Sequence, residues 1–188
     1  MLNKDDLIKY FLNGITEKGQ EKIGTEHEKF VYDRIDKSLI PYQGKRSITS
    51  LLESFIEDGW KPKYEDENIV ALLKDNASIT LEPGGQFELS GAPLDTVHDT
   101  CREINNHLKF VKSIEEKMGI GFLGLGFLPI QGLEEVPHVP KKRYSEIMRP
   151  YMKNIGGLGL DMMHRSCTVQ ANFDYVSELD MQKKIRVS

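Results

Sequence analysis

The segment from residue 60 to residue 91 alternates between apolar and polar side chains, and this pattern constrains the fold of the 188-residue chain more than any other feature. Turn sequences interrupt the alternation at Asp75-Asn76 and at Pro83-Gly84-Gly85. Short runs joined by tight turns pair as antiparallel neighbours. The pattern therefore predicts an antiparallel meander with strands at residues 69–74, 78–82 and 86–90.

Two short helices are indicated by apolar residues at spacings of three and four. The first covers residues 5–13, and Gly14 is available to end it in a left-handed cap. The second begins with a capping box formed by Ser50 and Glu53 and stops near Gly59. Each helix carries one apolar stripe, as amphipathic helices do.

A much longer helix follows the meander. Asp95 can cap its first turn, and Gly119 ends it. We expect this helix to cover one face of the sheet with an apolar stripe that consists of Val97, Cys101, Ile104, Leu108, Val111, Ile114 and Met118.

The last third of the chain is predicted to add two strands and two helices. The apolar run at residues 120–129 fits a buried strand. A strand within residues 164–175 has a polar face, open to solvent or to a ligand, and an apolar face. Helices are expected around residues 144–152 and from Ser177 onward. The apolar face of the strand consists of Cys167, Val169, Ala171 and Phe173.

Composition narrows the choice of partners. The formal net charge is −4 and the pI is near 5.8, so the chain lacks the basic surface that binds nucleic acids and anionic membranes. Cys101 and Cys167 have neither CxxC spacing nor a histidine cluster, which argues against a disulfide framework and a zinc site. No apolar stretch is long enough to span a bilayer. We therefore expect a cytoplasmic protein that acts on small molecules.

Carboxylates occupy an unusual place in the strand predicted within residues 20–32. Glu26 and Glu28 share one face of this strand, whereas Thr25 and His27 share the other. Positions two apart on a strand stand roughly 6.5–7 Å apart. Both carboxylates can therefore reach one divalent ion or two neighbouring ions. A solvated strand face is the alternative, because glutamate is usually exposed.

Two further carboxylates flank the Pro-Gly-Gly turn of the meander. A hairpin at this turn brings Glu82 and Glu88 together in space. Mg²⁺ prefers oxygen ligands and bridges protein carboxylates to nucleotide phosphates. We predict a site for Mg²⁺, with more than one ion, whose ligands are Glu26, Glu28, Glu82 and Glu88.

Three stretches of the sequence resemble glutamate–cysteine ligases of the plant and proteobacterial type: IGTEHEKF at residues 23–30, ITLEPGGQFELSG at residues 79–91, and LGLDMMHRSCTVQANFDY at residues 158–175. The resemblance implies an α+β fold with the glutamine-synthetase-like carboxylate–amine ligase core, in which helices pack behind an antiparallel sheet that forms one wall of the active site. Members of this family are longer. Residues 1–188 are therefore expected to be the N-terminal portion of the catalytic domain, truncated at the C-terminus.

The resemblance also implies a reaction. ATP would phosphorylate the γ-carboxylate of glutamate, and the amino group of cysteine would displace phosphate to give γ-glutamylcysteine, the precursor of glutathione. By similarity, Arg165, Thr168 and Gln170 line the amino-acid site from the strand within residues 164–175. Arg165 is the expected catalytic residue, because its guanidinium can pair with a substrate carboxylate. Mg²⁺ is the implied cofactor and ATP the co-substrate.

Two other functions stay open at this point. The chain can belong to a carboxylate–amine ligase that uses another amine acceptor, or it can be a non-catalytic module that binds Mg²⁺ or a nucleotide.

Overall fold

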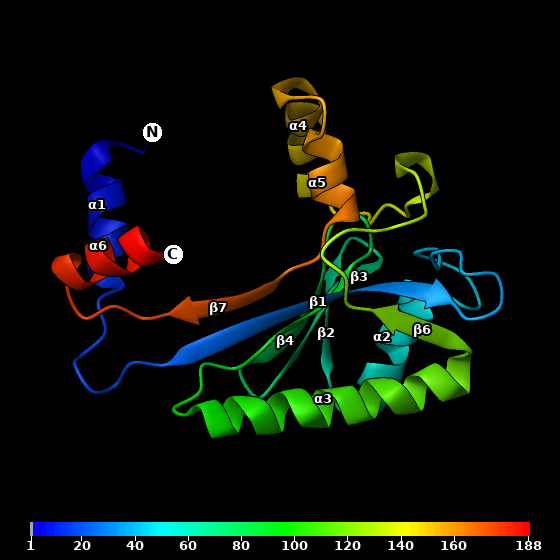
Figure 1. The fold of residues 1–188 in the computed structure, drawn as a ribbon, viewed down its shortest axis with the longest axis horizontal. Helices are drawn as coiled ribbons and strands as arrows, with labels where there is room; N and C mark the ends of the chain where they lie inside the picture. Colours follow the sequence, from blue (N-terminus) through cyan, green and yellow to red (C-terminus); the bar gives the residue numbers. More distant parts are fainter. Residues whose placement is uncertain (1) are drawn as a thin grey trace.

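The computed structural model describes residues 2–188, which form one seven-stranded sheet with helices packed against it (Figure 1). All the strand pairings are antiparallel, and the main order is β2-β3-β4-β5-β1-β6. The predicted α+β class is confirmed. The strands are β1 (Ile23–Asp33), β2 (Lys61–Glu65), β3 (Asn68–Lys74), β4 (Ala77–Leu81), β5 (Phe87–Ser90), β6 (Ile120–Leu123) and β7 (Val169–Phe173).

The long strand β1 organises the sheet. One of its edges pairs with β5, and its other edge pairs with β7 near the start and with β6 near the end. In Figure 1, β7 lies alongside β1 over much of its length. The last strand of the chain is thereby placed beside the first.

The helices occupy three places in Figure 1. The long α3 runs along one face of the sheet with α2, whereas α4 and α5 stand at the opposite end of the view and α1 and α6 lie beyond β7 near both termini. None of the helices within residues 2–188 has the length and apolar character needed to cross a membrane. The helices are α1 (Lys4–Asn13), α2 (Ile48–Glu57), α3 (Val97–Met118), α4 (Arg149–Ile155), α5 (Gly159–Arg165) and α6 (Glu178–Val187), with a 3₁₀ turn at Leu133–Glu135 and a π-helical turn at Arg143–Met148.

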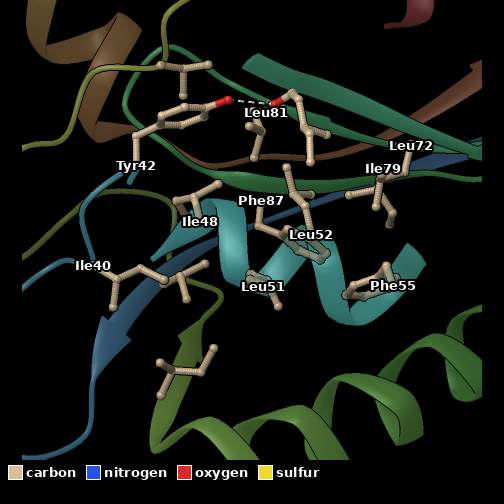
Figure 2. Packing of buried hydrophobic residues seen from close by; sticks show 14 of the residues in the cluster. Ile40, Tyr42, Ile48, Leu51, Leu52, Phe55, Leu72, Ile79, Leu81 and Phe87 are labelled. Atoms are coloured by element: carbon tan, nitrogen blue, oxygen red, sulfur yellow. Dashed lines mark hydrogen bonds between the residues drawn. The ribbon is translucent and has the colours of Figure 1, made fainter. Parts of the chain in front are cut away.

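The main core lies between the sheet and α2, which contributes Leu51, Leu52 and Phe55 to it (Figure 2). The strands β4 and β5 contribute every second residue to this core. Because side chains alternate across a strand, the residues between them, such as Thr80 and Glu88, lie on the opposite face of the sheet. The core residues from these two strands are Ile79, Leu81, Phe87 and Leu89.

The start of α2 differs from the prediction. The helix begins at Ile48, with Ser47 as its N-cap, and not at the predicted capping box of Ser50 and Glu53. Ser50 instead closes the box on Ser47: the Ser47 N–H donates to Ser50 Oγ at 2.9 Å, and the Ser50 N–H donates to Ser47 Oγ at 3.2 Å. The earlier start buries Ile48, which is 1% exposed. Burial of this side chain favours the longer helix.

The caps of the other two predicted helices are partly as expected. Gly119 ends α3 in the left-handed conformation, with φ of 68°, as predicted. The N-cap of α3 is Thr96, whose side chain accepts from Asp99 N–H, and the prediction of Asp95 is wrong. Gly14 ends α1 with φ of −85°, so the predicted left-handed cap is wrong there.

The buried stripe of α3 is also shifted from the prediction. Val111 and Ile114 are buried, but Val97, Cys101 and Leu108 are exposed. The helix turns Thr100 and His107 inward instead. His107 is held there by stacking on Phe87, with ring centroids 6.0 Å apart and an interplanar angle of 13°.

The predicted strand within residues 164–175 begins later than expected. His164 and Arg165 belong to α5, and β7 starts only at Val169. Of the residues predicted for the apolar face, Cys167 is buried, but Val169 and Phe173 are 76% and 62% exposed. The apolar face of β7 is therefore open among residues 2–188, because β7 pairs with β1 alone and no helix packs over it.

Two further predictions for the strands need correction. The strand expected over residues 120–129 ends at Leu123, and Leu125 and Phe127 are nearly half exposed. The edge strand β2 was not predicted, since Pro62 lies inside it and proline is tolerated only at sheet edges. The predicted helix that opens at Ser177 is confirmed as α6, with Ser177 as its N-cap.

Candidate active site

Glu28 and Glu88 lie directly opposite each other on β1 and β5, on the face of the sheet that points away from α2 and α3. In the same row, Thr80 of β4 lies opposite Glu88. Directly opposite residues have Cβ atoms about 4.5–5.5 Å apart. Two carboxylates are therefore neighbours in the middle of the sheet.

A second polar row crosses the sheet two residues away. Glu26 of β1 lies opposite Ser90 of β5 on one side and opposite Gln170 of β7 on the other. Glu82 follows β4 at the hairpin, where its N–H donates to the Gln86 carbonyl at 3.0 Å. We call the surface formed by Glu26, Glu28, Glu82 and Glu88 the acidic face.

Glu88 is the most buried carboxylate of the acidic face, at 7% exposed. Thr80 Oγ1 donates to one of its oxygens at 2.9 Å, and Ser90 Oγ donates to the other at 2.6 Å. A buried carboxylate is costly unless its oxygens are hydrogen-bonded. The hydroxyls of β4 and β5 supply these bonds.

Glu28 is held by the segment that leads into β7. The Thr168 N–H donates to one Glu28 oxygen at 3.0 Å, and Thr168 Oγ1 donates to the other at 2.9 Å. Burial raises the pKa of Glu28, the two bonds from Thr168 oppose this change, and the charges of Glu88 and Glu26 add to it. Glu26 in turn accepts from Asn172 Nδ2 at 2.9 Å.

The pKa of Glu82 is raised well above its ordinary value. Burial, followed by the charges of Glu88 and Glu28, raises its pKa to about 7, and Lys141 and Arg143 oppose the rise. The carboxyl is therefore partly protonated at neutral pH. Burial disfavours the charged form of a carboxyl group, and like charges nearby add to this effect.

The structure brings the four glutamates to one face, while their role as metal ligands stays a prediction. Within residues 2–188, no three His, Cys, Asp or Glu side chains are arranged as a ready-made metal centre. The donor set nevertheless fits Mg²⁺, since it consists of carboxylate oxygens. Burial is the main cause of the raised pKa of Glu82, and the charges of Glu88 and Glu28, which add to it, are what a divalent cation would neutralise.

A cationic segment beside Glu82 was missed by the sequence analysis. Lys141 Nζ and Tyr144 Oη each donate to the Leu81 carbonyl at 2.9 Å, at the end of β4. The Arg143 guanidinium lies over the Tyr144 ring, 5.1 Å from its centroid. Burial lowers the pKa of Lys141, and Glu82 opposes that change. The signal that marks this segment is a run of three basic residues directly before the tyrosine, Lys141-Lys142-Arg143.

The hairpin turn between Glu82 and Glu88 is locked against α5. A side chain at Gly84 would collide with the His164 carbonyl oxygen, so only glycine fits there. Gln86 secures the same contact, because its Nε2 donates to the Ser166 carbonyl at 2.9 Å while its Oε1 accepts from the Gly84 N–H at 2.8 Å. The position of Glu82 thus depends on α5.

Arg165 does not lie on a strand, which corrects the sequence analysis. It is the last residue of α5, where Nη1 donates to Asp161 Oδ1 at 2.6 Å and the guanidinium lies 4.6 Å from the Phe127 ring centroid. Residues four positions apart in a helix lie on the same side of it, so the helical conformation of α5 brings Arg165 next to Asp161. The guanidinium is therefore already paired.

The other two predicted substrate residues adjoin the acidic face. Thr168 binds Glu28, as described, and Gln170 lies opposite Glu26 and donates to Asn172 Oδ1 at 2.8 Å. Their substrate contacts stay predictions.

Comparison with known proteins decides the family. The model of glutamate-cysteine ligase family 2 matches residues 22–188. The chain belongs to this family. It is 51% identical over 186 residues to the chloroplastic glutamate–cysteine ligase of Nicotiana tabacum and to the chloroplastic glutamate–cysteine ligase A of Oryza sativa subsp. japonica, and 50% identical to the chloroplastic enzyme of Arabidopsis thaliana. The resemblance seen in the sequence is confirmed.

These matches cover 98% of this chain but only 35–37% of the relatives. The chain thus spans about a third of the length of the curated ligases that it matches. The prediction of a cytoplasmic location is wrong by this comparison, because the named relatives are chloroplastic.

The sequence stretches that carry the glutamate–cysteine ligase resemblance meet at the acidic face. Residues 23–30 lie in β1, residues 79–91 form the hairpin of β4 and β5, and residues 158–175 run through α5 and β7. The hydrogen bonds of Thr168 with Glu28 and of Gln86 with Ser166 join all three. Segments far apart in the sequence therefore build one surface.

Proposed function

We propose that this chain is the N-terminal portion of the catalytic domain of an ATP-dependent glutamate–cysteine ligase with a glutamine-synthetase-like core. The observation that carries the proposal is the acidic face, with Glu28 and Glu88 in register and the pKa of Glu82 raised to about 7. Membership of the family supports the substrates, glutamate and cysteine.

The proposed reaction has two steps. The γ-carboxylate oxygen of glutamate attacks the terminal phosphorus of ATP and displaces ADP, which gives γ-glutamyl phosphate. The amino group of cysteine then attacks the acyl carbon, loses a proton and displaces phosphate, which forms the amide bond of γ-glutamylcysteine. Both steps move a highly charged phosphoryl group, so catalysis depends on positioning and on neutralising charge.

Glu26, Glu28, Glu82 and Glu88 would hold Mg²⁺ in this proposal. When bound, Mg²⁺ neutralises phosphate charge and bridges the nucleotide to the protein. The hydroxyls of Thr80, Ser90 and Thr168 fix the orientation of the carboxylates, as groups around a metal site do.

Lys141 and Arg143 would supply positive charge next to the acidic face. Both act electrostatically on Glu82, so they lie within reach of an anion held beside it. Arginine is suited to phosphate and carboxylate recognition. We assign this segment to attraction of the phosphate or carboxylate groups of the substrates.

Arg165 has a more demanding role in the proposal. Its guanidinium pairs with Asp161. A substrate carboxylate must therefore bind Arg165 together with Asp161, or take the place of Asp161. Five N–H donors allow Arg165 to bind both. The cation–π contact with the Phe127 ring would hold the guanidinium in place meanwhile.

The test is phosphate release from ATP by a chain of the relatives' full length that carries these 188 residues as its N-terminal third. The proposal requires release that depends on both glutamate and cysteine. Release that proceeds equally with another amine in place of cysteine would instead identify a ligase with a different amine acceptor.

A non-catalytic module that binds Mg²⁺ or a nucleotide is the second candidate, because the carboxylate oxygens of the acidic face suit Mg²⁺ whether or not a reaction follows. Mixing the chain with the remaining segment of the tobacco ligase, expressed separately, separates the two. Restored turnover supports the catalytic role, and binding without turnover supports the module.

A further inference from the structure

A cavity of about 280 Å³ opens on the helix side of the sheet, between α2, α3 and the turn that joins β3 to β4. Its lining includes Phe55, Trp60 and Phe110. Phe110 and Trp60 both meet Phe55 edge to face, with centroids 4.8 Å and 5.8 Å from it. The cavity, which we call the α3 cavity, therefore has a rigid aromatic wall.

The α3 cavity is separate from the acidic face. Leu89 of β5 lines the cavity, whereas its neighbour Glu88 belongs to the acidic face. Successive residues of a strand point to opposite faces of the sheet. The two sites are thus on opposite sides of one strand.

The lining of the α3 cavity carries an excess of negative charge. Lys74 pairs with Asp58, with Nζ and Oδ2 3.0 Å apart, so these two charges compensate each other. Asp75 and Glu103 also line the cavity, and neither has a salt bridge within the described residues 2–188. Two carboxylates are left without a cation.

Two residues that line the α3 cavity have buried side-chain atoms without a hydrogen-bond partner. His107 is 8% exposed and its Nε2 has no partner within residues 2–188. Glu103 accepts from the Ala92 N–H at 2.9 Å through Oε1, but its Oε2 is buried without a partner. Burial lowers the pKa of His107 to about 3, so His107 is neutral at pH 7 and adds no positive charge.

We propose that the α3 cavity binds a small organic cation, a protonated primary amine carried on a flat apolar body. The ammonium group would compensate Glu103 and Asp75, and the apolar body would pack on Phe55, Trp60 and Phe110. Aromatic faces attract cations as well as apolar groups. The volume suits a compact ligand, since it lies just below the range of pockets for drug-sized molecules. This inference does not depend on the ligase activity.

Trp60 provides a direct readout, because it is the only tryptophan in the chain and it lines the α3 cavity. The experiment titrates the 188-residue protein with phenethylammonium and, separately, with 2-phenylethanol, which has a similar apolar body and no charge. The expected result is a saturable change in Trp60 fluorescence with phenethylammonium, and binding at least about tenfold weaker with 2-phenylethanol. Equal affinity for the two probes, or no saturable change, would overturn the proposal.

Two variants test the contribution of the buried carboxylate. Glu103→Gln keeps the shape and the acceptor for the Ala92 N–H but removes the charge, and we expect it to weaken phenethylammonium binding about tenfold. Glu116→Gln removes a charge from an exposed position of the same helix and should leave binding unchanged. If Glu103→Gln, shown to be folded by circular dichroism, binds as tightly as the unmodified protein, the proposal is wrong. If Glu103→Gln does not fold, the comparison of phenethylammonium with 2-phenylethanol on the unmodified protein tests the proposal by itself.

Discussion

Glu88 on β5 lies directly opposite Glu28 on β1, in the centre of the sheet. Like charges at directly opposed positions destabilise a sheet. Here each carboxylate accepts hydrogen bonds from hydroxyl groups instead, Glu88 from Thr80 of β4 and Ser90 of β5 and Glu28 from Thr168. An arrangement that stability does not favour points to a role in binding, and it motivates the predictions that follow.

The first prediction concerns Glu82→Gln. The pKa of Glu82 rises from about 4.5 to about 7 on folding, so its contribution to stability is complete below pH 4.5 and is lost as the pH rises through 7. The free energy of unfolding of Glu82→Gln, measured relative to that of the unmodified protein, should therefore be higher at pH 8 than at pH 4.5 by about 2–3 kcal/mol. Urea denaturation at the two pH values measures this difference.

Glu67→Gln is the matched control for this experiment, since Glu67 is exposed in the turn between β2 and β3. Glu67→Gln should have the same dependence of stability on pH as the unmodified protein. The account of Glu82 fails if its variant and the unmodified protein have the same dependence of stability on pH.

The second prediction concerns His107→Phe. Burial lowers the pKa of His107 from 6.5 to about 3, so its contribution to stability is complete above pH 6.5 and is lost as the pH falls toward 3. The unmodified protein should lose about 2 kcal/mol of stability between pH 7 and pH 5 through this group. Phenylalanine has no titrating group and can keep the stacking on Phe87.

Denaturation by urea at pH 7 and pH 5 measures the loss, which should shrink by about 2 kcal/mol in His107→Phe. His98→Asn changes an exposed histidine of the same helix and should retain the full loss. Equal losses in both variants would contradict the assignment to His107.

The third prediction concerns Gly84→Ala in the hairpin turn. The added methyl group would meet the His164 carbonyl oxygen and would also lie 2.9 Å from Gln86 Oε1 and from Val136 Cγ1. We expect a loss of about 1–3 kcal/mol, because the turn must separate from α5. Thermal unfolding followed by circular dichroism measures it. Gly124→Ala, where the methyl group meets nothing within 4 Å, should change stability by less than about 0.5 kcal/mol, and a similar loss in both variants would refute the proposed contact.

Local patterns in the sequence predicted the strands that are regular and well bounded. The meander and the shared face of Glu26 and Glu28 follow from alternation and turn residues alone, and the structure has both. The end of α3 could also be predicted from local sequence, because a glycine in the left-handed conformation commonly ends a helix.

Predictions that depended on tertiary contacts were less successful. Alternation in residues 164–175 did not reveal that Arg165 belongs to α5, whose position depends on the distant turn at Gly84. The inward position of His107 likewise depends on Phe87 in another strand. The basic segment at Lys141 and Arg143 was missed as part of the site for the same reason, since only the fold brings it to Glu82.

The central claim, that the acidic face holds Mg²⁺, is tested most directly by calorimetric titration with Mg²⁺ of the unmodified protein and of Glu28→Gln. This substitution keeps the shape of the side chain and removes one charge from the acidic face. We expect Mg²⁺ binding to weaken at least about tenfold in Glu28→Gln, and Glu67→Gln to bind as the unmodified protein does. Unchanged Mg²⁺ affinity in a folded Glu28→Gln protein would contradict the account.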